Sequence, residues 1–238
     1  MGSLSPELLR SRLAYDHEVV RELRAPILGC IRAFASEQER RAGHEVDADR
    51  AALGGARLYE VEYRFPVLVG AGRTTDRVLV RFDLLAGGNY PHSEPLVAVV
   101  SRPLPWSPHV HPGSGVVCLG TGWKSNRTLF AHLVVHVARA LNCDEPDLGP
   151  GYEGWNGDAV RYWRKELNSR PLNALVYPVL PSRLTHGVGD EATFRRAAAT
   201  DAAFTPIVAD RADAVFAPVA LSAAHEPDPA FRPIRLAS

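Results

Sequence analysis

The 238-residue chain is 46% hydrophobic, which is enough for the core of one domain of about 150 residues with an extension, or of one large domain. Its 27 Lys and Arg residues balance its 27 Asp and Glu residues, so no net charge favours nucleic acid or an anionic membrane as a partner. The apolar runs are too short to span a bilayer, and we expect no secretory signal because the first residues lack its basic-then-apolar order.

The cysteine content indicates the redox compartment. An odd and low number of cysteines argues against a disulfide framework and favours a reducing compartment, so we expect a cytoplasmic protein. The three cysteines are Cys30, Cys118 and Cys143.

The first part of the chain predicts an amphipathic helix over residues 6–24. Ser5 is a suitable N-cap, and Pro6 fits the first turn. Pro26 ends or bends this helix, and we expect a second helical piece over residues 27–41. The apolar positions of the first helix recur at helical spacing: Leu9, Leu13, Val20 and Leu23.

The period of the hydrophobic pattern then changes to two, which is typical of half-buried strands. Apolar and polar residues alternate over residues 59–65 and again over residues 78–84, with a glycine-containing turn at 70–72 between them. Residues 96–100 form a short, fully apolar run. These segments predict an antiparallel meander, and we expect a fourth strand beside the three.

The second half of the chain predicts helices after an irregular region. Four prolines exclude regular strand pairing from much of residues 101–127. Helices are expected over residues 128–141 and 156–168. After them the chain becomes rich in proline, so we divide it into a domain of residues 1–170 and an extension of residues 171–238. The extension is expected to be an arm packed on the domain or a partly disordered segment.

Cys118 is the candidate reactive residue. It follows a strand and precedes a helix in a loop rich in proline and glycine, with His109, His111 and Trp123 close in sequence. A thiol is a good acyl carrier because its thioester reacts with amines. Nearby imidazoles lower the pKa of a thiol or donate to an oxyanion during acyl transfer. A buried structural cysteine is the alternative that composition alone leaves open.

The order of these elements resembles that of the ubiquitin-conjugating enzyme family, over about residues 5–168. A helix, antiparallel strands, a proline-rich loop with a cysteine and two helices follow one another in both. The resemblance implies an α+β, ubiquitin-conjugating (UBC-like) fold, in which helices pack against an antiparallel four-stranded sheet. It gives no account of residues 40–56 or of the C-terminal extension.

Five short motifs carry the resemblance, in the order of the family. Residues 90–95 (Tyr-Pro-His-Ser-Glu-Pro) resemble its Tyr-Pro-x-x-x-Pro turn, and residues 107–110 (Ser-Pro-His-Val) resemble its His-Pro-Asn-Ile motif. Residues 115–119 (Gly-Val-Val-Cys-Leu) resemble its Gly-x-Ile-Cys-Leu active site. Trp123 precedes the next helix as in the family, and residues 144–147 resemble its acidic loop with a proline.

The resemblance implies roles for the matched residues. Cys118 would be the thioester nucleophile. His109 takes the place of the family's asparagine, which supports the oxyanion or orders the loop, although it lies one residue further from the cysteine than in the family. An imidazole N–H can serve as the donor, and His111 is an equally close candidate in sequence.

The matched acidic loop implies a carboxylate that acts on the incoming amine. Asp147 matches the family's acidic residue, which suppresses the pKa of the incoming lysine or positions it. Asp144 and Glu145 are the neighbouring candidates. A carboxylate near the thioester is reasonable because only the neutral amine attacks.

The family's partner surfaces are placed more loosely. The helix of residues 6–24 would face the activating enzyme, and the loops at 90–95 and 106–108 would face a ligase or another partner. A charged helix face that is merely solvated is the alternative. The arginines available on this helix are Arg10, Arg12, Arg21 and Arg24.

The resemblance therefore implies a carrier enzyme. It would accept a ubiquitin-like modifier from an activating enzyme as a thioester on Cys118 and transfer it to a lysine amine of a protein target. No metal or other cofactor is expected at this step, because the energy of ATP is already stored in the thioester. The loop at residues 149–156 departs from eukaryotic members, so we expect a bacterial relative, of the kind that occurs with a JAB-type protease in antiphage defence systems.

The chain has only two lysines, Lys124 and Lys165. Genomic base composition explains such a bias, and so does selection against amines that intercept an activated thioester. The sequence alone leaves both explanations open.

A zinc enzyme is one rival interpretation. His132 and His136 lie four residues apart on a predicted helix and therefore share a face, and His109, His111, Cys118 and Cys143 offer more ligands. Against it, the sequence lacks the glutamate of a His-Glu-x-x-His motif and any close pair of cysteines. The simpler interpretation of His132 and His136 is a polar helix face beside Arg139.

Two further rivals concern Cys118 itself. A cysteine hydrolase would pair it with His109 or His111, but no third residue that would orient the histidine is evident downstream. A non-catalytic binding module with the same fold is the other alternative, as in family variants that lack the cysteine.

Overall fold

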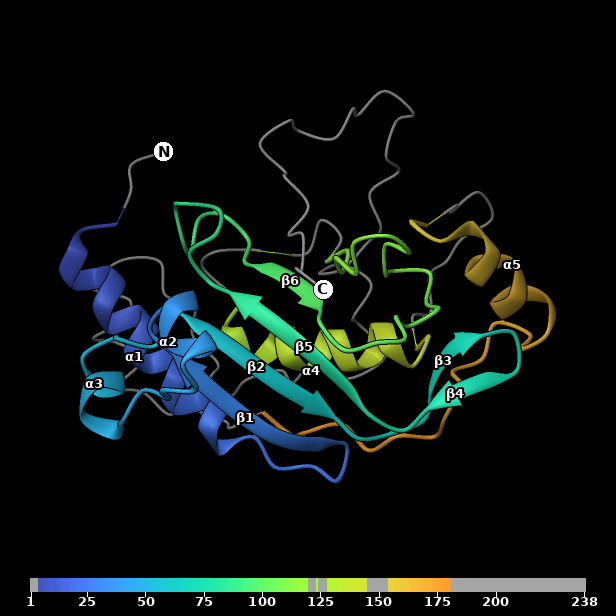
Figure 1. Ribbon diagram of the computed structural model, residues 1–238, viewed down its shortest axis with the longest axis horizontal. Helices are drawn as coiled ribbons and strands as arrows, with labels where there is room; N and C mark the ends of the chain where they lie inside the picture. The colour runs from blue at the N-terminus through green and yellow to red at the C-terminus, as the bar shows by residue number, and fades with distance from the viewer. Residues whose placement is uncertain (1–3, 120–122, 124–127, 145–153, 181–238) are drawn as a thin grey trace, which may run out of the picture.

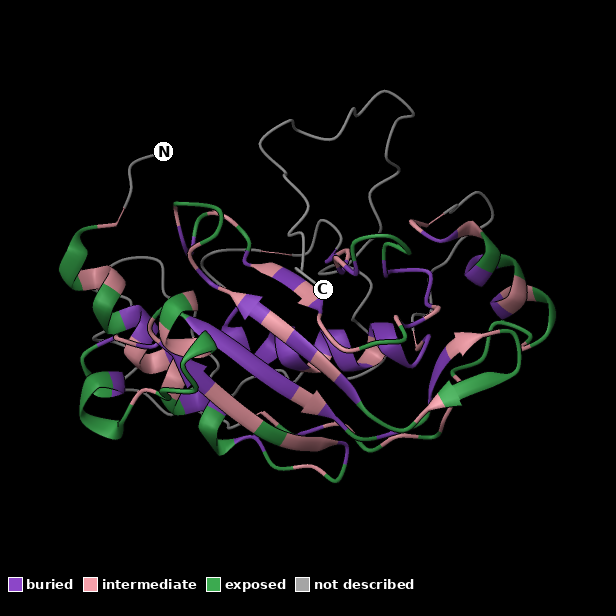
Figure 2. Cartoon of the chain, in the orientation of Figure 1, coloured by how far each residue is buried: buried purple, intermediate pink, exposed green. Residues whose placement is uncertain are grey.

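The computed structural model describes residues 4–119, 123, 128–144 and 154–180 (Figure 1). It has an α+β fold in which an N-terminal helix is followed by a four-stranded antiparallel sheet, and helices pack against that sheet. Burial is concentrated in the sheet and in the long helix behind it, whereas the turn and the second strand of the small hairpin at one end are mostly exposed (Figure 2). None of the helices in these described ranges is long and apolar enough to cross a membrane.

Helix α1 (Pro6–Glu22) confirms the first predicted element. The Ser5 hydroxyl accepts a hydrogen bond from the backbone N–H of Leu8 at 3.3 Å, and proline occupies the first turn, as the capping pattern predicts. Leu13, Val19 and Val20 are buried in the core on the face that meets the sheet. The helix ends where Leu23 becomes extended, three residues before Pro26.

The helical prediction for residues 27–41 is largely wrong. Residues Leu28–Phe34 form strand β1, which is the expected fourth strand, and only Glu37–Arg41 is helical (α2). In β1 the apolar Ile31 and Ala33 face the core, while Arg32 between them pairs with Glu60 on the other face. A register irregularity between residues 28 and 31 interrupts this alternation, which explains why the period of two was missed.

The sheet is a simple meander with spatial order β1-β2-β5-β6. Strands β2 (Leu58–Tyr63), β5 (Val78–Asp83) and β6 (Leu96–Val99) are the three that the alternation predicts. Between β2 and β5 the chain forms a separate hairpin of β3 (Val67–Gly70) and β4 (Arg73–Thr75). A short helix, α3 (Ala48–Ala52), lies between α2 and β2 in the chain.

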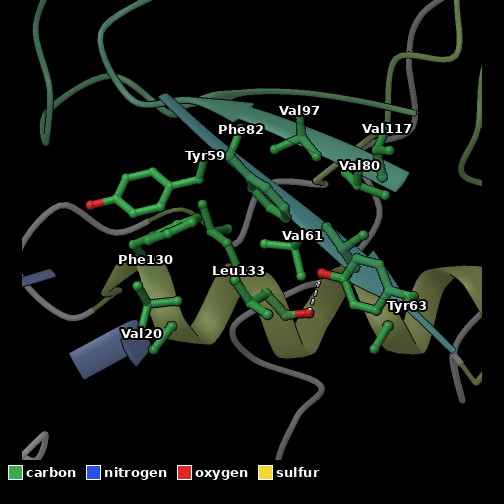
Figure 3. Packing of buried hydrophobic residues seen from close by; sticks show 14 of the residues in the cluster. Val20, Tyr59, Val61, Tyr63, Val80, Phe82, Val97, Val117, Phe130 and Leu133 are labelled. Atoms are coloured by element: carbon green, nitrogen blue, oxygen red, sulfur yellow. Dashed lines mark hydrogen bonds between the residues drawn. The ribbon is translucent and has the colours of Figure 1, made fainter. Parts of the chain in front are cut away.

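The inner face of the sheet packs on helix α4 (Phe130–Leu141) (Figure 3). Phe130 contacts two aromatic rings of the sheet, with ring centroids 4.4 Å from Tyr59 and 5.2 Å from Phe82. The hydroxyl of Tyr63 donates a hydrogen bond to the carbonyl oxygen of Val134 at 2.8 Å, so its polar end is satisfied inside the core. Helix α5 (Gly157–Lys165) follows and is shorter than the predicted residues 156–168.

A buried ion pair connects α1 to the start of α4, and it corrects one prediction. Arg12, assigned to the partner surface, is 1% exposed; its Nε lies 2.6 Å from Oδ2 of Asp16 and its Nη2 donates to the carbonyl of Thr128 at 2.7 Å. Asp16 in turn accepts a hydrogen bond from the backbone N–H of Phe130 at 2.9 Å. The hydroxyl of Tyr90 also donates to Asp16. Arg12 is therefore an internal strut between two helices.

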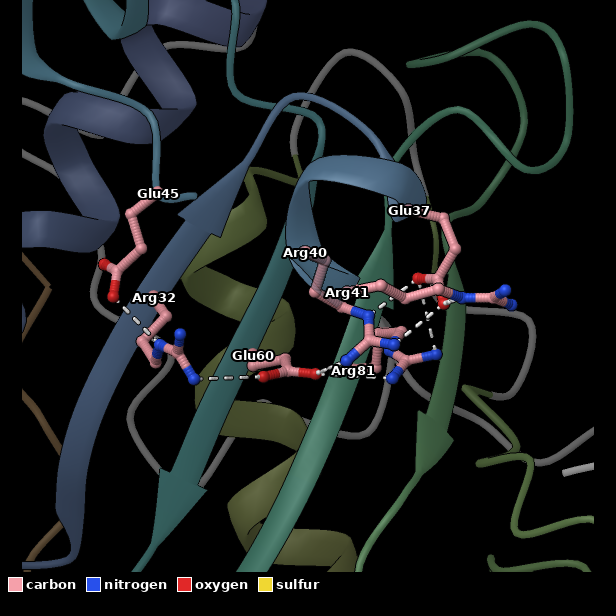
Figure 4. A network of polar contacts seen from close by, with 7 residues as sticks. All are labelled: Arg32, Glu37, Arg40, Arg41, Glu45, Glu60 and Arg81. Atoms are coloured by element: carbon pink, nitrogen blue, oxygen red, sulfur yellow. Dashed lines mark hydrogen bonds and ion pairs between the residues drawn. The ribbon is translucent and has the colours of Figure 1, made fainter. Parts of the chain in front are cut away.

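The outer face of the sheet carries a network of charged residues (Figure 4). Glu60 is buried there beneath α2, and three arginines contact its carboxylate: Nη1 of Arg40 at 3.1 Å, Nη2 of Arg81 at 3.3 Å and Nη1 of Arg32 at 3.8 Å. Glu37 pairs with Arg40 of its own helix at 2.7 Å and also lies 3.7 Å from Nη1 of Arg81, so it ties α2 to β5. The buried carboxylate is compensated by the surrounding guanidinium groups.

The predicted extension begins as an extended segment that packs on the domain. Over residues 171–180, which we call the strap, Leu175, Tyr177 and Leu180 pack against the core. Val176 points the other way and is 75% exposed. Of the two alternatives for the extension, a packed arm describes this part; residues 181–238 lie outside the described residues.

Candidate active site

A hairpin of residues 109–118 carries Cys118 and extends the sheet beyond β6. The backbone N–H of Cys118 donates to the carbonyl of His109 at 2.8 Å, and that of His111 donates to Val116 at 2.9 Å. The second arm of the hairpin is attached to the sheet, because the N–H of Val117 donates to Val97 at 2.9 Å. The backbone that precedes Cys118 is therefore held by the sheet.

Gly115 makes this attachment possible. Its φ is +76°, in the left-handed region that favours glycine, and the N–H of Val99 donates to its carbonyl at 2.8 Å. A Cβ at this position would lie 2.7 Å from the carbonyl oxygen of Val99. The glycine of the Gly-x-Ile-Cys-Leu resemblance is thus required by the close approach of the two backbones.

The three thiols differ in their access to solvent, and none of them forms a disulfide. Cys118 is half-buried, whereas Val117 and Leu119 on either side are 3% and 4% exposed, so alternation along the chain directs the cysteine away from the core. Cys143 is buried, and burial raises the pKa of its thiol to about 12. Cys30 is exposed on β1, the edge strand at the other side of the sheet.

His109 is buried between the hairpin and α4. Its backbone N–H donates to the hydroxyl of Ser107 at 3.3 Å, and that hydroxyl donates to the carbonyl of Ala140 in α4 at 2.7 Å. Burial lowers the pKa of His109 to about 4, so its imidazole is neutral at pH 7. Burial, and then the nearby His109 and Arg139, lower the pKa of His136 on α4 to about 3.

His111 has a different environment from His109. It is exposed, and its Nδ1 accepts hydrogen bonds from the backbone N–H groups of Gly113 at 3.2 Å and Ser114 at 3.1 Å. Its ring lies against that of Trp155, with centroids 6.0 Å apart. The side chain therefore stabilises the turn of the hairpin, and Nδ1 is not available as a donor to a reacting group.

Trp123 fastens the chain that follows Cys118 to the turn at residues 90–91. Its indole Nε1 donates to the carbonyl of Pro91 at 2.7 Å, and its ring centroid lies 5.8 Å from that of Tyr90. Since Tyr90 is held by the buried pair of Arg12 and Asp16, Trp123 is connected through it to α1. Trp123 is thus held in place by the turn at residues 90–91.

Of the three acidic candidates, the structure describes only Asp144. Asp147 and Glu145 lie outside the described residues. Asp144 follows the end of α4, and its Oδ2 accepts a hydrogen bond from the hydroxyl of Tyr177 at 2.6 Å. Tyr177 belongs to the strap, and the only signal for this contact in the sequence is an aromatic residue in a proline-rich segment.

His132 and His136, the two helix histidines of the metal interpretation, are buried. His132 caps the start of its own helix, because its Nδ1 accepts from the backbone N–H of Leu129 at 3.1 Å. His136 is 5% exposed, so the interpretation of these two as a polar helix face is wrong. Within the described ranges, no three His, Cys, Asp or Glu side chains gather where they would hold a metal ion.

The comparisons with known proteins leave the family open. No protein-family model matches the chain, and no curated protein is significantly similar to it.

Proposed function

We propose that this protein is a ubiquitin-conjugating-type carrier, which accepts a ubiquitin-like modifier as a thioester on Cys118 and transfers it to a lysine amine. The observation that carries the proposal is the placement of Cys118. Its thiol is half-buried and directed away from the core, at the end of a hairpin held rigidly by β6. A rigid backbone with an accessible thiol is what acyl transfer requires of its nucleophile.

The reaction has two acyl transfers. In the first, the Cys118 thiolate attacks the thioester between the modifier and the activating enzyme; a new C–S bond forms, and the old C–S bond breaks to release the activating enzyme's thiolate. In the second, a neutral lysine amine attacks the carbonyl carbon. A C–N bond forms, the C–S bond to Cys118 breaks, and the proton lost by the amine passes to solvent or to a nearby carboxylate.

His109 is our candidate for stabilising the oxyanion that forms in each step. Its neutral imidazole keeps one N–H that can donate, and the hydrogen bond between its carbonyl and Cys118 places the two residues side by side on paired backbone segments. His111 is the weaker candidate because its Nδ1 is occupied in the turn. A second role for His109, as support for the hairpin through Ser107 and α4, is compatible with the first.

The expected partners follow from the resemblance of the motifs to the ubiquitin-conjugating enzyme family. We expect an activating enzyme, a ubiquitin-like modifier and a protein target, and a JAB-type protease in the same bacterial system. With Arg12 buried, the basic side chains left on or just after α1 for an activating enzyme are Arg10, Arg21 and Arg24.

A non-reducing gel distinguishes the carrier from its rivals. With activating enzyme, modifier and ATP, the carrier forms an adduct that reductant removes; Cys118→Ala forms none, and Cys118→Ser forms an ester that survives reductant. Cys30→Ala is the matched control, because this exposed thiol lies on the opposite edge of the sheet. A binding module forms no adduct, and a cysteine hydrolase cleaves the modifier without retaining it; either result would refute the proposal.

A further inference from the structure

Two asparagines lock the strap onto the end of α4. Asn142 is fully buried, and its side-chain Oδ1 accepts from the backbone N–H of Asn173 at 3.0 Å and from its Nδ2 at 2.8 Å. The Nδ2 of Asn142 donates in return to the carbonyl of Asn173 at 2.9 Å. The carbonyl of Asn142 accepts from the N–H of Leu172 at 2.9 Å, and Asn173 also reaches the carbonyl of Pro66 at 2.7 Å. These mutual hydrogen bonds fix the position of the strap along the end of α4.

This position of the strap brings Tyr177 to Asp144. The Tyr177 hydroxyl donates to Oδ2 of Asp144 at 2.6 Å and accepts from Nδ2 of Asn142 at 3.1 Å. Burial, and then the hydrogen bond to the carboxylate, raise the pKa of Tyr177 well above its ordinary value. The phenol therefore stays protonated and keeps its role as a donor to the carboxylate over the whole working range of pH.

Asp144 is connected to the hairpin of Cys118 by a short series of contacts. It lies four residues after Ala140, just beyond the end of α4, and the carbonyl of Ala140 accepts a hydrogen bond from the hydroxyl of Ser107 at 2.7 Å. Ser107 holds the backbone of His109, and the carbonyl of His109 holds Cys118. The strap and the reactive hairpin thus meet at the same end of α4.

We infer that the strap positions Asp144 for the second acyl transfer, with Tyr177 and Asn173 as positioning residues. This inference rests on the proposed function. One oxygen of the Asp144 carboxylate is fixed by Tyr177, and the other receives the hydrogen bond of the incoming amine. The amine nitrogen then forms the C–N bond, the C–S bond to Cys118 breaks, and the released proton passes to water. The first transfer involves no amine, so it does not need the strap.

The test separates loading from discharge. Wild type and variants are loaded with modifier by the activating enzyme and ATP, the ATP is removed, and the thioester is chased with increasing concentrations of free lysine. We expect Tyr177→Phe, Asn173→Ala and Asp144→Asn to load normally and to discharge about three- to tenfold more slowly, with the loss mainly in the dependence on lysine concentration. Val176→Ala, which changes an exposed side chain on the same strap, is the matched control and discharges as wild type.

A double-mutant cycle decides whether Tyr177 acts through Asp144. The inference predicts that Tyr177→Phe combined with Asp144→Asn discharges no more slowly than Asp144→Asn alone, because the two residues act as one unit. Multiplied losses, or a wild-type rate for Tyr177→Phe, overturn the inference while the proposed function stands. Failure of the wild type to load overturns both.

Discussion

The carbonyl oxygen of His109 accepts the backbone hydrogen bond of Cys118 at 2.8 Å, so the buried imidazole and the accessible thiol lie on paired strands of one hairpin. The two arms of this hairpin are held from different sides. The arm of His109 is fixed to α4 through Ser107, and the arm of Cys118 is fixed to β6. Both the sheet and the long helix therefore define the position of the reactive residue.

The attachment of the hairpin to β6 depends on Gly115. Gly115→Ala is expected to lower the free energy of unfolding by about 2–4 kcal/mol, because it adds a left-handed alanine and a clash with the carbonyl of Val99. Gly88→Ala is the matched control: its φ is +73° and no atom lies within 4 Å of the added Cβ, so it should cost about 1 kcal/mol. Urea denaturation of both variants measures the difference, and equal losses would contradict the account.

The same substitution has a functional consequence. Because Gly115 positions the arm of Cys118, Gly115→Ala should slow thioester formation in a population that is still folded, whereas Gly88→Ala should not. Loading is measured in buffer without urea, after circular dichroism has shown that both variants are native. Normal loading by folded Gly115→Ala would contradict this expectation, because it would show that thioester formation does not depend on the hairpin conformation at Gly115.

The buried histidines predict a loss of stability in acid. Burial lowers the pKa of His109 and His132 to about 4 and that of His136 to about 3, below the ordinary value of 6.5. The unfolded chain therefore binds protons that the native protein does not, so stability is complete above pH 6.5 and falls as the pH decreases toward 4. Between pH 6.5 and 4.5 each histidine should account for about 2 kcal/mol.

Urea denaturation across this range of pH measures the slope. His136→Gln should flatten it, since glutamine takes up no proton, while His44→Gln at an exposed position should leave it unchanged. A wild-type stability that is constant from pH 6.5 to 4.5 would contradict the buried, neutral state of these imidazoles.

The ion pair of Arg12 and Asp16 should matter far more than a surface pair. Arg12→Ala leaves the buried carboxylate of Asp16 without its cation and should lower the free energy of unfolding by about 3–5 kcal/mol. Arg161→Ala removes the ion pair with Asp158, in which both side chains are exposed, and should cost about 0.5 kcal/mol or less. Similar costs in the two variants, measured by urea denaturation, would show that Arg12 is not a strut.

Much of the sheet could be predicted from the sequence because strands β2 and β5 are uninterrupted. Along each strand, apolar residues such as Val61 in β2 and Val80 in β5 recur at every second position. Strand β1 could not be predicted, because its alternation is broken by a register irregularity. Arg12 was misplaced for a related reason. An arginine on an amphipathic helix is normally solvated, and its burial depends on Asp16 together with distant partners, Tyr90 and Thr128, which meet it only in the fold.

The candidate site was predictable in part. The cysteine and its neighbouring histidines stand out by spacing, but the sequence treats His109 and His111 alike, and only tertiary packing separates a buried imidazole from one that stabilises a turn. The contact of Tyr177 with Asp144 was missed because it joins residues that lie 33 positions apart in the sequence, and the strap has no recognisable pattern.

Intact-mass spectrometry of the protein after incubation with activating enzyme, modifier and ATP tests the acyl-carrier proposal most directly. The account predicts a mass increase of one modifier minus one water, reversed by a thiol reductant, and peptide mapping that locates the adduct on Cys118 in wild type and in Cys30→Ala. An adduct that forms equally in Cys118→Ala, or the absence of any adduct with an activating enzyme that loads its own cysteine, would contradict it.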